Sequence, residues 1–167
     1  HQEFLKLCIS KAKESHAIST VILFDPHPEK VIRQLKSFPL LTPLQEKVQK
    51  IKQVGMEQII VIDFSNDFQK IRPEEFIIQI LLEEFNMGAV FVGYNYHFGY
   101  QKKGDKNLIR ELSCQYQFQS YIIKPVKSKG NEKISSTVIK EYILHGKIEK
   151  ANQLLGYVYQ LSGKVIH

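Results

Sequence analysis

Three short stretches of the chain hold side chains suited to binding phosphates or a flat ring. The stretch 26–28 reads Pro-His-Pro, in which two prolines restrict the backbone around a histidine. The stretch 93–99 reads Gly-Tyr-Asn-Tyr-His-Phe-Gly, where glycines permit close backbone approach and aromatic rings can pack a planar ligand. The stretch 133–140, Lys-Ile-Ser-Ser-Thr-Val-Ile-Lys, places three hydroxyls between two lysines. These residue types suit packing of a flat ring at 93–99 and binding of a phosphate chain at 133–140.

Each stretch also has a purely structural explanation. Pro-His-Pro is compatible with a rigid turn, and the stretch 93–99 with an aromatic corner of the core. The stretch 133–140 is compatible with an ordinary serine-capped helix that carries solvated lysines. Only the place of each stretch in the fold can distinguish the structural explanation from ligand binding.

The surrounding segments alternate between strand-like and helix-like patterns. Short apolar runs predict strands at 20–24, 58–64, 89–92 and 118–123, the first of them buried on both faces. Helical spacing and capping residues predict helices at 3–14, 43–54, 105–116, 135–144 and 148–155, and another that starts at Pro73. Strands that alternate with helices predict a doubly wound, Rossmann-like α/β fold with a parallel sheet.

All three stretches lie where such a fold binds ligands. In doubly wound sheets the ligand lies beyond the carboxyl ends of the strands, and the stretches 26–28 and 93–99 each follow a predicted strand directly. The stretch 133–140 opens a helix, where free backbone N–H groups and the helix dipole favour an anion.

Composition narrows the class of protein. A chain of 167 residues with 43% hydrophobic and 24% charged residues suits one globular domain and argues against global disorder. The net charge of +6 favours anionic partners, although a lysine-rich surface also serves solubility alone. Cys8 and Cys114 belong to no metal-binding motif, which argues against a disulfide framework or a structural zinc site. No apolar run is long enough to predict a membrane span.

In their order along the chain, these motifs resemble the adenylyltransferase module of bacterial bifunctional riboflavin kinase/FAD synthetases, which belongs to the HxGH nucleotidyltransferase superfamily. The matching segments are His1-Gln2 (the end of H-x-G-H-Q), 24–28 (F-x-P-H-P), 41–47 (L-T-x-L-x-E-K), 64–76 (F-x-x-x-F…P-E-E-F), 93–99 (G-x-[ND]-[FY]-x-F-G), 134–140 (I-S-S-T-x-I-R) and 151–156 (A-N-x-L-L-G). Each motif is weak alone, but seven in the correct order identify the family.

The resemblance implies that AMP passes from ATP to FMN, giving FAD and pyrophosphate, with Mg²⁺ accompanying ATP. It implies catalytic roles for His1 and Lys140. The implied ATP and phosphate ligands are Lys133, Ser135, Ser136, Thr137, Lys140, Gly93 and Asn95. The implied FMN ligands are Pro26, His27, Pro28, Asn95 and Tyr96. Neither a dedicated metal site, nor a nucleic-acid partner, nor a membrane partner is expected, and the expected location is the cytoplasm.

The chain also departs from the family pattern. Its first strand and the first histidine of H-x-G-H are absent, while Lys140 and His97 stand where arginine is usual. We therefore expect residues 1–156 to form an N-terminally incomplete FMN adenylyltransferase domain that is poorly stable alone. Residues 157–167 are expected to be a linker and the first-strand stub of a riboflavin kinase module. Two alternatives remain: a relict flavin- or nucleotide-binding module without turnover, and a sister nucleotidyltransferase with another phosphorylated substrate.

Overall fold

The structure is a computed structural model that describes residues 2–124 and 134–161. Two compact units divide the chain, His1–Lys124 and Pro125–His167. Of the predicted site residues, His1 and Lys133 lie outside the described residues, as does most of the predicted kinase stub. The boundary expected at residue 156 stays a prediction.

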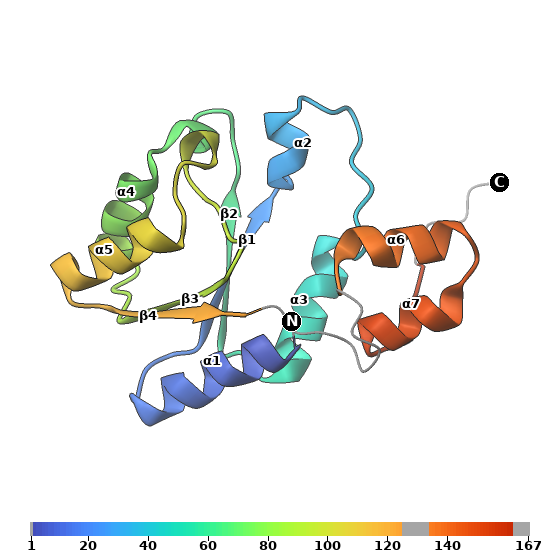
Figure 1. Cartoon of the computed structure of the whole chain (residues 1–167), viewed down its shortest axis with the longest axis horizontal. Helices are drawn as coiled ribbons and strands as arrows, with labels where there is room; N and C mark the ends of the chain where they lie inside the picture. The colour runs from blue at the N-terminus through green and yellow to red at the C-terminus, as the bar shows by residue number, and fades with distance from the viewer. Residues whose placement is uncertain (1, 125–133, 162–167) are drawn as a thin grey trace. The chain divides into compact units, whose positions relative to one another are not determined.

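Two pairs of parallel strands form the framework of the first unit (Figure 1). Strand β1 (Thr20–Asp25) pairs with β2 (Gln58–Asp63), so that their last residues lie opposite each other. Strand β3 (Ala89–Gly93) pairs with β4 (Gln119–Ile123). All four predicted strands are present, with ends within one residue of those expected, and the parallel α/β class is confirmed.

The predicted burial of the first strand on both faces is wrong. Within the part of the chain that the structure describes, the two pairs form separate two-stranded sheets, and β1 has one strand neighbour. Residues 20–24 are half-buried, and Val61 on β2 is 46% exposed. A strand is buried completely only when both edges have neighbours and both faces are covered.

Helices α1 (Gln2–Glu14), α3 (Leu44–Val54) and α5 (Lys106–Tyr116) agree closely with the sequence patterns. The carboxylate of Asp105 accepts hydrogen bonds from the backbone N–H groups of Asn107 and Leu108, and so caps α5 as predicted. Gly55 ends α3 with a φ of 103°. The start of α3 differs by one residue, because Pro43 keeps an extended backbone and takes the cap position expected for Thr42.

The helix predicted from Pro73 has an unexpected winding. It begins as α4 (Pro73–Glu75) and continues as the π-helix η2 (Phe76–Glu84). The apolar residues between 76 and 82 are almost continuous, so their pattern does not distinguish a π-helix from an α-helix.

One hydrophobic core serves both strand pairs. Its buried members are Phe76, Ile77, Leu81, Val92, Phe98, Ile109, Leu112 and Phe118. Ile22 and Phe24 of β1 pack against this cluster, as does Ile122 of β4. The shared packing holds the carboxyl ends of the two pairs within one unit, although no ladder joins the pairs among the described residues.

The second unit contains a helical hairpin. Helix α6 (Ser136–Leu144) is followed by α7 (Ile148–Leu155), with a turn at Gly146. Ser135 caps α6, because its hydroxyl oxygen accepts a hydrogen bond from the backbone N–H of Val138 at 3.3 Å. Ile139 and Ala151 are buried. Both helices lie where the sequence predicted them.

Candidate active site

The Pro-His-Pro stretch begins a short helix that the sequence patterns did not reveal. Helix α2 (Pro28–Ile32) starts directly after β1 and the two residues that follow it. His27 is its N-cap residue, since His27 Nδ1 accepts a hydrogen bond from the backbone N–H of Glu29 at 3.2 Å. The imidazole also stacks on Phe38, with ring centroids 4.5 Å apart. The histidine is therefore held in place from two sides. The sequence feature that could have predicted this helix is a proline directly after a possible cap residue.

A surface hollow of about 550 Å³ adjoins this stretch. Its lining residues are Pro26, Lys30, Val31, Gln34, Leu35 and Asn66. Pro26 was predicted to contact a ligand, whereas the other five were not. They come together only because α2 forms and because Asn66 follows the neighbouring strand β2. The lining combines apolar side chains with a cation and two amides, which suits a ring that carries polar substituents.

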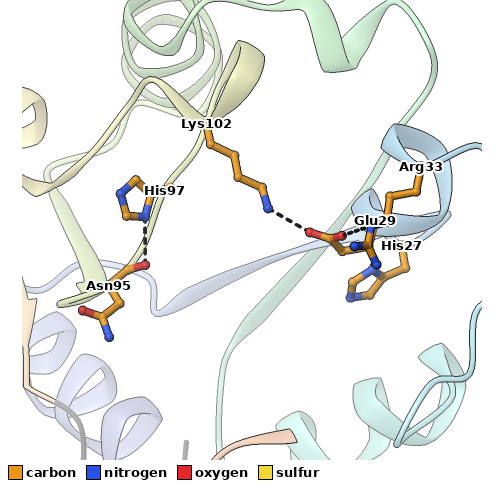
Figure 2. A network of polar contacts seen from close by, with 6 residues as sticks. All are labelled: His27, Glu29, Arg33, Asn95, His97 and Lys102. Atoms are coloured by element: carbon orange, nitrogen blue, oxygen red, sulfur yellow. Dashed lines mark hydrogen bonds and ion pairs between the residues drawn. The ribbon is translucent and has the colours of Figure 1, made fainter. Parts of the chain in front are cut away.

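The loop after β3 is partly buried core and partly exposed surface. Phe98 is 7% exposed, and its backbone exchanges two hydrogen bonds with Gly104. Tyr96 stacks on Phe98 with centroids 5.7 Å apart, yet 38% of Tyr96 remains exposed. Asn95 is exposed, and its backbone oxygen lies 3.0 Å from His97 Nδ1 (Figure 2). Phe98 therefore belongs to the hydrophobic core, as the structural alternative predicted, while Asn95 and Tyr96 stay accessible to a ligand.

The glycines of this loop have different surroundings. A Cβ atom at Gly99 would lie 2.6 Å from Pro73, and the φ of Gly99 is 70°. A Cβ at Gly104 would meet Pro73 and the ring of Phe98. At Gly93 no atom lies within 4 Å of such a Cβ. The fold therefore requires Gly99 and Gly104, whereas Gly93 leaves open space at the carboxyl end of β3.

A lysine that the sequence did not single out lies beside this loop. The Nζ atom of Lys106 is 3.3 Å from the ring centroid of Tyr94, a cation–π contact. A hydrogen bond from Lys106, together with its charge, lowers the pKa of the Tyr94 hydroxyl. The carboxyl end of β3 is thus bordered by a cation and an aromatic ring.

An ion pair joins the residues that follow the stretches 26–28 and 93–99. Lys102 Nζ donates a hydrogen bond to Glu29 Oε1 at 2.9 Å, although the two residues are 73 positions apart. Glu29 Oε2 lies 3.5 Å from Arg33 Nε on the same helix. Figure 2 shows Lys102 reaching from the segment after β3 to Glu29 on α2. The hydrogen bond from Lys102, together with its charge, lowers the pKa of the Glu29 carboxyl.

The remaining predicted ligands are at the start of α6, in the second unit. Ser136 and Thr137 occupy its first turn and are exposed. Ser135 is the cap residue, and Lys140 is half-buried about one turn inside the helix. An exposed helix N-terminus with two hydroxyls can bind an anion such as a phosphate.

Residues 1–138 match the family model described as FAD synthetase, a range that includes the Pro-His-Pro stretch, the loop after β3 and the start of α6. The chain belongs to the FAD synthetase family.

The names of proteins with similar sequences are consistent with membership of the FAD synthetase family. A bifunctional riboflavin kinase/FMN adenylyltransferase of Buchnera aphidicola subsp. Acyrthosiphon pisum is 34% identical over 92% of this chain and 49% of its own length. An FAD synthetase of Listeria monocytogenes serovar 1/2a is 32% identical over 99% of this chain and 66% of its own length. The chain spans about half the length of the bifunctional relatives that it matches.

A solved structure has the same fold as this FAD synthetase family member. It is the crystal structure of a macrolide-efflux protein from Streptococcus pneumoniae, with a TM-score of 0.77 and 26% sequence identity. The likeness covers 94% of this chain and 50% of that one. Macrolide efflux is the role that this name gives to the Streptococcus protein. Among the described residues of this chain, no helix combines the length and the hydrophobicity that a membrane span needs.

Proposed function

We propose that the protein is an FMN adenylyltransferase, which transfers AMP from ATP to FMN and releases pyrophosphate. This proposal rests on the match between residues 1–138 and the FAD synthetase family model. The geometry supports it, because the stretches expected to bind FMN both follow the carboxyl ends of parallel strands, the usual ligand edge of such a fold.

In the proposed reaction, an oxygen of the FMN phosphate attacks the α-phosphorus of ATP. A new bond forms between that oxygen and the α-phosphorus, while the bond from the α-phosphorus to the bridging oxygen of the β-phosphate breaks and pyrophosphate leaves. Catalysis of this kind depends mainly on positioning and on stabilising negative charge. His1, from the family motif, is assigned to the α-phosphate.

The phosphate chain of ATP is assigned to the start of α6. Ser136 and Thr137 are exposed there, next to free backbone N–H groups. Ser135 caps the helix and so orders this turn. Lys133 and Lys140 would neutralise the leaving pyrophosphate. Gly93 is assigned to close approach by ATP, because its surroundings have room for a ligand.

The FMN ligands are assigned to Pro26, His27, Pro28, Asn95 and Tyr96. We propose that the flavin ring lies against the hollow beside Pro26, where Val31 and Leu35 offer apolar surface and Lys30 offers a cation. The exposed amide of Asn95 would hydrogen-bond the nucleotide or the FMN phosphate.

Mg²⁺ would enter the site with ATP. Among residues 2–124 and 134–161, no group of three or more His, Cys, Asp or Glu side chains could hold a metal ion. The donors present, hydroxyls and an amide, suit a cation whose other ligands are phosphate oxygens and water. Bound there, Mg²⁺ would offset the phosphate charge as pyrophosphate leaves.

Two further proposals concern the whole protein. A C-terminal riboflavin kinase module would accompany this chain, as the names of the bifunctional relatives suggest. A strand from another part of the protein would pair with β1 and β3. The unpaired edges of β1 and β3 among the described residues support such a strand.

The deciding experiment is an assay of FAD formation from FMN, ATP and Mg²⁺. It compares the full-length protein with residues 1–167. We expect FAD from the full-length protein and little or none from the shorter chain. FMN binding without FAD formation by the full-length protein would instead support a relict binding module. Activity with another phosphorylated substrate, but not with FMN, would support a sister nucleotidyltransferase.

A further inference from the structure

The ion pair Glu29–Lys102 lies beside the residues assigned to FMN, and the proposed reaction gives it no role. Glu29 is the second residue of α2, directly after the stretch 26–28. Lys102 follows the loop 93–99 on the other strand pair. The 2.9 Å contact between Lys102 Nζ and Glu29 Oε1 therefore connects the two parts assigned to FMN (Figure 2).

Both ends of this connection have a well-defined backbone. On one side, the N–H of Glu29 donates to the ring of His27, so Glu29 and His27 are positioned together. On the other side, the N–H of Lys102 donates to the oxygen of Gly99 at 3.0 Å, and the N–H of Tyr100 donates to Ile71 at 2.8 Å. A shift of Glu29 would thus move the cap histidine, and a shift of Lys102 would move the loop after β3.

The backbone at Lys102 is strained. Gln101 and Lys102 have φ values of 56° and 58°, in the left-handed region that non-glycine residues seldom occupy. Such conformations persist where the surroundings impose them. Here the bridge between Phe98 and Gly104 and the tight contact of Gly99 with Pro73 impose the path of the loop. The result is that Lys102 projects toward α2.

Resting on the proposed function, we propose that Glu29 and Lys102 are positioning residues that fix the spacing between the His27 stretch and the loop 93–99, and thereby set the affinity for FMN. An exposed ion pair contributes little to folding stability. Its contribution here is to geometry, since a ligand held by two separate loops is sensitive to their spacing.

The test is a double-mutant cycle in the full-length protein with Glu29→Gln, Lys102→Met and the two combined. We expect each single change to raise the KM for FMN about two- to fivefold, the range available to an exposed ion pair. The KM for ATP and the thermal midpoint should change little. The double variant should resemble the single ones, because either change alone removes the whole interaction. Lys102→Arg should retain the wild-type KM.

The cycle also separates positioning from direct binding of a phosphate by Lys102. Direct binding predicts that Lys102→Met is as damaging in the Glu29→Gln background as in the wild type, and that Glu29→Gln alone has no effect. Either result would overturn the proposal. The matched control is Lys11→Met, which removes the exposed 2.6 Å pair between Lys11 and Glu14 within α1 and should leave the KM for FMN unchanged.

Binding and turnover of FMN by the wild-type protein separate the positioning role from the proposed activity. The wild-type protein is measured first, for FAD formation and for FMN binding by flavin fluorescence. If it binds FMN without forming FAD, the function fails, and the same cycle on the dissociation constant for FMN still tests the pair. If it neither binds FMN nor forms FAD, both proposals are wrong. Equal KM values in the wild type and all variants overturn only the positioning role.

Discussion

At the start of α6, neighbouring hydroxyl groups have different environments. Ser135 accepts a hydrogen bond from the N–H of Val138, whereas Thr137 is exposed in the first turn. One hydroxyl therefore serves the helix, and the other is available to a ligand. This separation allows the structural and functional explanations of the Ser-Ser-Thr motif to be tested independently.

Thr137→Ala should lower FAD formation by roughly ten- to hundredfold, the value of a hydrogen bond to a charged group. Its thermal midpoint should stay that of the wild type. Ser135→Ala should instead destabilise the protein by about 1 kcal/mol through loss of the cap. Steady-state assays and thermal melts of the full-length variants measure both effects, with Thr137→Ser as the conservative control. Near-normal turnover in Thr137→Ala would remove Thr137 from the phosphate site.

Two glycines of one loop should respond oppositely to the same substitution. Gly99→Ala would bring a Cβ within 2.6 Å of Pro73 at a φ of 70°, so we expect a clearly lower thermal midpoint. Gly93→Ala meets no atom within 4 Å and should fold normally, but should weaken ATP binding because it fills space assigned to the ligand. Gly88→Ala, which is equally uncrowded, is the control. Unchanged ATP affinity in Gly93→Ala would contradict the assignment of Gly93.

Among the elements, β1 and β2 are tied at their amino ends by a charged side chain. The carboxylate oxygen Glu57 Oε2 accepts hydrogen bonds from the backbone N–H of Ser19 at 2.8 Å and from its hydroxyl at 2.9 Å. Ser19 is buried, whereas Glu57 is exposed. The two hydrogen bonds from Ser19 lower the pKa of the Glu57 carboxyl below its ordinary value of 4.5.

This tie predicts a pH effect on stability. Because the folded pKa is lowered, the stabilisation is present above pH 4.5 and is lost as the pH falls through the folded pKa. Glu57→Gln should be somewhat less stable at neutral pH and should lose less stability below pH 4.5. Thermal midpoints of the wild type and the variant between neutral and acidic pH measure the difference. Parallel curves would show that this carboxylate does not contribute.

For the whole molecule, we expect the unpaired edges of the strands to have the largest effect on stability. Within the described residues, β1 and β3 each pair along one edge only. Backbone N–H and C=O groups left without partners in a packed sheet reduce stability. A strand contributed by another part of the protein would satisfy both edges.

Residues 1–167 alone should therefore unfold at a lower temperature and less cooperatively than the full-length protein. Thermal unfolding followed by circular dichroism compares them, and an upstream extension without the kinase module separates the effect of the strand from that of the module. A sharp, high-temperature transition of residues 1–167 alone would contradict the expectation.

Most of the fold follows from local patterns. Asp105 and Ser135 cap helices where predicted, Gly55 ends α3, and four apolar runs form parallel strands. These features depend on hydrogen bonds and side-chain spacing within a few residues, which a sequence displays directly. The positions of the ligand stretches after strands follow from the same patterns, while the roles of their residues stay predictions.

The family, the class of fold and the stretches that follow the strands could thus all be predicted from the amino-acid sequence. Three contacts became visible only in the folded chain: His27 caps a helix and stacks on Phe38, Glu29 pairs with Lys102, and five further residues join Pro26 around a hollow. It also distinguished Gly93 from Gly99. Such contacts escape sequence patterns because of distance along the chain: residues 73 positions apart meet only once the core has packed, and no local pattern encodes that contact.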